Sequence, residues 1–91
     1  MLKGKTNTGF QFKIDEEARD DMEMLEMLTA LSKGDYTMLP DVLRQLLGEE
    51  QKKSLYEHCR GKSGRVSSKR VLAELESVFD VAKESDSDTK N

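Results

Sequence analysis

Few side chains in this sequence could carry acid–base, nucleophilic or metal chemistry. His58 is the only histidine, and Cys59 beside it is the only cysteine. No serine or cysteine lies in a recognisable nucleophile motif, and His58 has no partner at the spacing of a zinc or non-haem iron site. We interpret His58 as a structural histidine, and Cys59, one helical turn after Leu55, as a small buried hydrophobe. The sequence therefore predicts no enzyme, no catalytic residue, no cofactor and no metal.

Two further patterns invite a chemical interpretation. Seven carboxylates lie in residues 15–26, but on a helix they would wrap around the axis, and the segment lacks the central glycine of a calcium loop. Gly61-Lys62-Ser63 resembles the end of a phosphate-binding loop, yet the position of the required upstream glycine is Tyr56. We expect neither a cation site nor a nucleotide site. For the acidic segment, binding of a basic protein stays open beside a solvated helix face.

Composition restricts the class of protein. The chain has 91 residues, a net charge of −3 and 36% charged residues, which predicts one domain with a small core. No dense Lys/Arg block is present, so nucleic-acid binding is not expected. A single cysteine, the lack of a long apolar run and the lack of a signal-peptide core favour a reducing cytoplasm without membrane contact.

An N-terminal β-hairpin is expected to open the domain. Phe10, Phe12 and Ile14 alternate with polar residues at the period of a half-buried strand. Asn7-Thr8-Gly9 suits a three-residue loop, so residues 2–6 should pair with residues 10–14. A lone hairpin is marginal in water, and the phenylalanines should therefore pack on the helices that follow.

About four helices should complete a small bundle. Asp15 is the expected N-cap of a first helix that extends to about Ser32, with Ala18, Met22, Leu25 and Leu28 as one apolar stripe. Further apolar residues widen this arc to roughly 220°, so the helix needs cover on two sides or carries a second face. Pro40 should open a second helix that Gly48 ends, and a third helix should cover residues 49–60.

The fourth helix should begin after Ser67. It carries an apolar stripe that faces the core, made of Val71, Leu72, Leu75, Val78, Phe79 and Ala82. Residues 84–91 contain no apolar side chain and are expected to be a disordered acidic tail. The predicted fold is therefore mainly α (α+β), with one domain over residues 1–83.

Several segments together resemble a family of small tail proteins of bacteriophages and Gram-positive prophages, the tail assembly chaperones. The segment with the most specific likeness is Leu-Leu-Gly-Glu-Glu-Gln-Lys-Lys-Ser-Leu-Tyr-Glu-His at residues 46–58. The likeness also includes Gly-Lys-Thr at 4–6 with Gly-Phe at 9–10, Asp-Asp-Met-Glu-Met-Leu-Glu at 20–26 and Gly-Arg-Val at 64–66. This chain departs at Ser67-Ser68, where relatives place a proline and an apolar residue, and at Cys59, where leucine is usual.

The resemblance implies a function in the cytoplasm of the bacterial host. Its members bind the tape measure protein, a long helical polypeptide, and keep it soluble while tail-tube proteins assemble; self-association is left open. Flexible side chains suit such a client, which makes Met24, Met27, Leu31 and Met38 the candidate partner-binding residues. The competing interpretation is that these residues fill gaps in the core. The alternative function is a small phage-encoded regulator that binds nucleic acid or a basic protein through charged helices.

Overall fold

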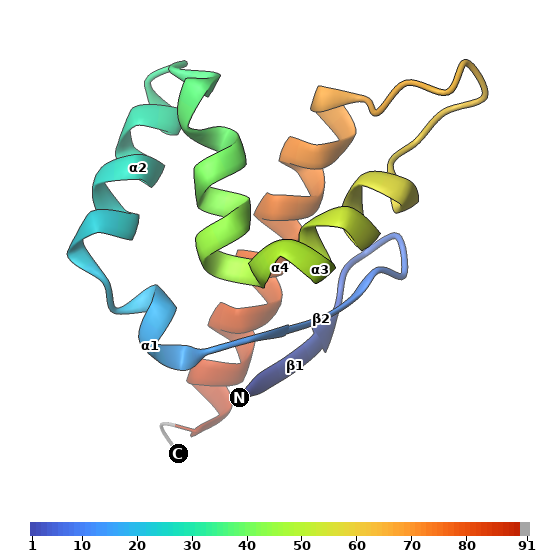
Figure 1. Cartoon of the computed structure of the whole chain (residues 1–91). Coiled ribbons are helices and arrows are strands. Elements are labelled where there is room, and N and C mark those ends of the chain that lie inside the picture. The colour runs from blue at the N-terminus through green and yellow to red at the C-terminus, as the bar shows by residue number, and fades with distance from the viewer. Residues whose placement is uncertain (90–91) are drawn as a thin grey trace.

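The computed structural model describes the backbone of residues 1–89 and the side chains of residues 1–83. Its elements are β1 (Leu2–Lys5), β2 (Gln11–Ile14), α1 (Glu16–Arg19), α2 (Met22–Ser32), the 3-10 helix η1 (Tyr36–Met38), α3 (Leu39–His58) and α4 (Ser68–Thr89) (Figure 1). A hairpin followed by helices confirms the predicted mainly helical α+β fold. The backbone of α4 continues into residues 84–91, the segment predicted to be a disordered tail, but the side chains of that segment lie outside the described part of the chain, so the tail stays a prediction.

The hairpin has the predicted pairing and orientation. Gly4 lies opposite Phe12 in the antiparallel register, and Gly9 takes the positive φ of 97° that the tight loop needs. Phe10, Phe12 and Ile14 are buried. A side chain at Gly4 would collide with Phe12 and with Val81 of α4, so this glycine lets the helix approach the sheet.

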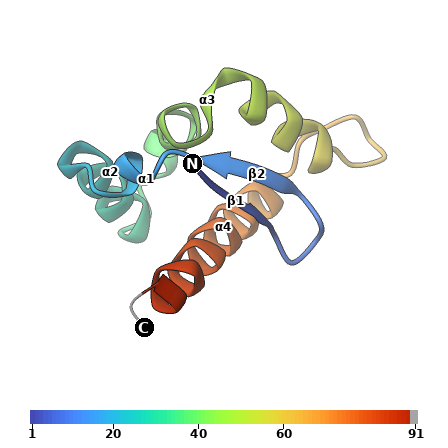
Figure 2. The ribbon, with the colours of Figure 1, turned by 90° about the horizontal axis from the view of Figure 1, so that it is seen from below.

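Both long helices hold the hairpin in place. α4 packs against β1, and α3 packs against β2. The side chain of Gln51 in α3 accepts the backbone N–H of Lys13 through Oε1 and donates from Nε2 to the carbonyl oxygen of Lys13, both at 2.7 Å. The Gln51 amide thus makes the hydrogen bonds that a neighbouring strand would make to Lys13 at the edge of β2. In the view from below, the hairpin lies between α3 and α4 (Figure 2).

The prediction of one continuous helix over residues 15–32 is wrong, because two helices cover this segment. Asp15 caps α1 as predicted, but Asp21 caps a second helix by accepting the backbone N–H of Glu23 at 2.9 Å. Short Asp side chains compete with helical backbone bonds, which explains the break. Of the stripe predicted on this helix, Met22 and Leu25 are exposed, whereas Ala18 and Leu28 are half-buried against the core.

The boundaries predicted around Gly48 and Ser67 are confirmed. Gly48 lies within α3 but has non-helical angles of φ 82° and ψ 165°, and the helix bends there (Figure 1). Pro40 lies in the first turn of α3. Ser67 accepts the N–H of Arg70 at 3.3 Å and so caps α4.

One apolar cluster joins the hairpin to α2, α3 and α4. Its largest fully buried side chains are Ile14, Met24, Val42, Leu43, Leu55, Cys59 and Val78. Cys59 and Leu55 are both inside, as their helical spacing predicted.

No helix within residues 1–89 has the apolar length that a membrane crossing would require.

Candidate functional site

An open apolar groove between α2 and α4 is the strongest candidate site. Its volume is about 490 Å³. The lining residues are Leu28, Leu31, Ser32, Tyr36, Leu72, Leu75, Glu76, Phe79 and Asp80. Most of the lining residues are apolar, and all but Tyr36 lie on the two helices α2 and α4.

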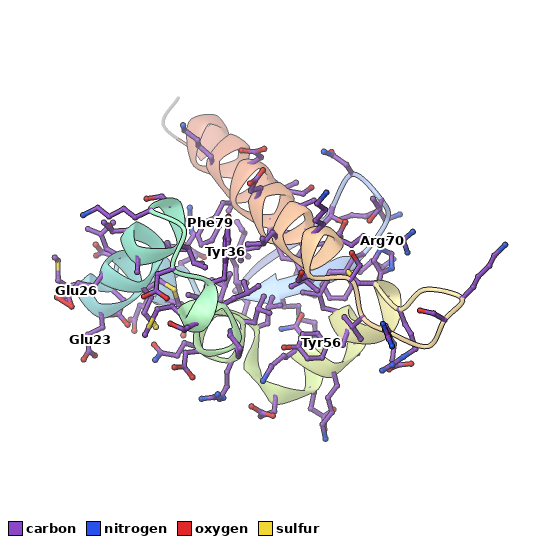
Figure 3. All side chains as sticks on the ribbon, turned by 90° about the horizontal axis from the view of Figure 1, so that it is seen from above. Glu23, Glu26, Tyr36, Tyr56, Arg70 and Phe79 are labelled. Atoms are coloured by element: carbon purple, nitrogen blue, oxygen red, sulfur yellow. The ribbon has the colours of Figure 1, made fainter. Side chains whose placement is uncertain are left out.

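The local sequence determines which residues form the edge of the groove. Gly34, at φ 94°, ends α2, and Asp35 caps η1, which places Tyr36 at the edge of the groove with 57% of its surface exposed. Phe79 approaches from α4, and both rings lie between α2 and α4 (Figure 3). Leu25 shares the face of Ser32, two helical turns along α2, and is 54% exposed. Apolar surface therefore continues beyond the groove along α2.

The four candidate partner-binding residues do not form one surface. Met24 is only 1% exposed, which corrects its assignment to an accessible binding face and matches the core-filling interpretation. Leu31 is largely buried but lines the groove between α2 and α4. Met27 and Met38 meet in a second, shallower groove of about 380 Å³, together with Glu23, Glu26, Ala30 and Gln45.

The opposite side of α4 is closed by a polar network. Glu74 is 4% exposed, and each of its oxygens accepts one threonine hydroxyl: Oε1 from Thr6 at 2.7 Å and Oε2 from Thr8 at 2.6 Å. The N–H of Asn7 donates to the hydroxyl of Ser77 at 2.9 Å. A buried carboxylate is stable when hydrogen bonds replace its water, so this network fastens the hairpin loop to α4.

His58 joins this network without forming a catalytic relay. Its Nε2 lies 2.8 Å from the hydroxyl of Thr8 and, because Thr8 donates to Glu74, Nε2 carries the proton. Oε1 of Glu74 is 3.8 Å from the same nitrogen. A serine- or threonine-type triad places the hydroxyl and the acid on opposite ring nitrogens. We therefore assign His58 a structural role, and its ring also packs on Phe10 at 5.5 Å between centroids.

Cys59 lies near this network and is 1% exposed. Burial raises the pKa of its thiol, the negative charge of Glu74 raises the pKa further, and Arg70 partly offsets both effects. A buried, protonated thiol is a poor nucleophile. The cysteine therefore behaves as part of the core.

The acidic N-terminal helices have a structural explanation. Asp15 and Asp21 each accept a backbone N–H at the start of a helix, at 3.0 and 2.9 Å. Negative charge in these first turns also suits the helix dipole. Within the described part of the chain, no group of three or more His, Cys, Asp or Glu side chains is arranged to hold a metal ion.

No protein family, curated protein or solved structure matches the chain.

Sequence reasoning placed Leu72, Leu75 and Phe79 on the core-facing stripe of the last helix, and did not bring them opposite Leu28 and Tyr36. The one signal that pointed to the groove was the apolar arc of the first predicted helix, which is too wide for a single buried face. Nothing in the sequence pairs Glu74 with the two threonines of the hairpin loop.

Proposed function

We propose that this protein is a phage tail assembly chaperone that holds apolar helical segments of the tape measure protein in the groove between α2 and α4. On this proposal it acts in the cytoplasm of the bacterial host. The single observation that supports the proposal most is the open groove, whose mainly apolar lining residues come from α2 and α4. The resemblance of residues 46–58 to tail assembly chaperones supports the choice of client.

The shape and chemistry of the groove suit a helix as the ligand. Amphipathic helices commonly bind by laying an apolar face into a hydrophobic groove, with anchors one turn apart. Leu72 and Phe79 lie two turns apart on α4 and are only partly buried, so they can receive such anchors. The exposed Met22 and Leu25, at 65% and 54%, add flexible apolar surface along α2. A chaperone benefits from such adaptable contacts because its client presents many different apolar faces.

Co-expression with the tape measure protein encoded nearest to the gene tests this proposal. We expect the client to be recovered in the soluble fraction and to co-purify at low salt and at roughly 0.5 M salt, because apolar contacts are not screened. The alternative, a regulator that binds nucleic acid or a basic protein through charged helices, predicts a complex that dissociates as salt rises. Client aggregation in the presence of the chain would contradict the chaperone proposal.

Two matched double variants locate the binding surface. Leu28→Gln with Phe79→Gln places amides in the groove between α2 and α4 at partly buried positions. Met27→Gln with Met38→Gln makes the same type of change in the shallower groove beside Glu23 and Glu26. We expect the first variant to lose at least about ten-fold in client affinity, since burying unpaired amides is unfavourable, and the second to retain it. The reverse result would move the site to the methionine groove.

A further inference from the structure

The charged residues that line the groove have one sign. Both of them, Glu76 and Asp80, are acidic, exposed and one turn apart on α4. Lys69 and Lys83 also lie on α4 but are not among the lining residues. The opposite wall, on α2 and η1, contributes the neutral polar residues Ser32 and Tyr36. The groove therefore has an apolar floor, one acidic edge and one neutral edge.

We infer that the helix bound in this groove carries Lys or Arg beside its apolar stripe, on the flank that faces α4. This inference rests on the proposed function and adds the chemistry of the client. Basic side chains at i and i+4 of a bound helix have the same spacing as Glu76 and Asp80, so two ion pairs can form along one edge. An acidic flank would instead place like charges together at a partly dehydrated boundary.

The asymmetry of the two edges also selects an orientation. A helix with an apolar stripe and one basic flank can place that flank against α4 in only one of its two directions along the groove. The opposite edge, at Ser32 and Tyr36, is neutral and selects no charge on the other flank of the bound helix. A client segment with a single basic flank should therefore bind in one direction.

Two synthetic helical peptides of about 18 residues test the charge preference. They share one Leu/Met stripe and differ only in whether the flank carries Lys or Glu at i and i+4. We expect the complete protein to bind the Lys peptide roughly ten-fold more tightly by fluorescence anisotropy at low salt, with the ratio falling as salt rises. Because this comparison uses the unmodified protein, it does not depend on the folding of any variant.

A charge reversal at the groove provides the second arm. Glu76→Lys with Asp80→Lys should invert the preference in favour of the Glu peptide. The control is Glu23→Lys with Glu26→Lys, which changes the net charge equally but on the flank of α2 that lies away from Tyr36 and Phe79 (Figure 3). Circular dichroism melting verifies that both variants fold. The control should leave the ratio of the two affinities nearly unchanged.

The outcomes separate this inference from the proposed function. Equal binding of the two peptides, with loss of both in the Leu28→Gln, Phe79→Gln variant, would overturn the inferred charge preference and leave the groove as the binding site. Equal shifts in the reversal and control variants would also overturn it, because the effect would then come from net charge. Failure of both peptides to bind would overturn the groove assignment as well.

Discussion

The two sides of α4 differ in packing, since one is closed against the hairpin and the other borders an open groove. On the side of the hairpin, Glu74 and Ser77 are buried and satisfied by hydrogen bonds, and Val81 meets Gly4. On the side of α2, Phe79 lies in an open groove with exposed Glu76 at its edge. Neighbouring positions of one helix thus serve a closed interface and an open one. The closed side can maintain the fold while the open side is left free for a partner.

The largest contrast should appear when apolar side chains are truncated on the two sides. Phe12→Ala removes a ring that is 2% exposed between the strands and α4, and should cost about 3–5 kcal/mol of unfolding free energy. Leu25→Ala, on the open side at 54% exposure, should change it by less than about 0.5 kcal/mol. Urea unfolding monitored by circular dichroism measures both. Similar losses in the two variants would mean that α2 is packed as tightly as the hairpin.

A smaller contrast is expected between two glutamates on α4. Glu74→Ala leaves the hydroxyls of Thr6 and Thr8 without their acceptor and should cost about 1–3 kcal/mol. Glu76→Ala, two residues later and exposed, should stay within about 0.5 kcal/mol. The same unfolding assay compares them directly. A neutral Glu74→Ala substitution would show that the network does not fasten the hairpin.

The smallest expected effect is the pH dependence contributed by Cys59 on the closed side. Its thiol pKa is raised in the folded protein, chiefly by burial, so the folded state favours the protonated thiol. The resulting stabilisation is complete below the pKa of the unfolded chain and is lost as pH rises through the folded-state pKa. Between pH 7 and pH 10, the unfolding free energy should therefore fall more in the wild type than in Cys59→Ala. Equal declines would show that this thiol titrates alike in both states.

Sequence patterns predicted the parts of this fold that depend on local chemistry. The period-two alternation ending at Ile14, the break at Gly48 and the cap at Ser67 all follow from residue type and spacing. The first helix was predicted as continuous because the periodicity across Asp20 and Asp21 does not show which of the two will cap a new helix. Within α2, the predicted stripe is exposed at Met22 and Leu25, whereas Met24, predicted as a partner-binding residue, is buried.

The candidate site was less predictable because it depends on contacts between distant segments. Leu28 and Phe79 line one groove although about fifty residues separate them, and the hairpin loop reaches Glu74 across an even longer stretch of chain. No local sequence pattern indicates which distant residues will contact each other. The sequence did indicate that the helix containing Met24 and Met27 needed cover on two sides or carried a second face. Of the residues selected for that face, Leu31 does line the groove, whereas Met24 is buried and Met27 lies in the second groove.

Amide chemical-shift mapping by NMR tests the central assignment most directly. The labelled protein would be titrated with soluble fragments of the tape measure protein encoded nearest to its gene. We expect the largest perturbations at Leu28, Tyr36, Leu72 and Phe79, and little change in the hairpin around Lys3 and Lys13. Perturbations confined to the exposed lysines of the hairpin, or to Met27 and Met38, would contradict the groove between α2 and α4 as the site at which this protein holds its client.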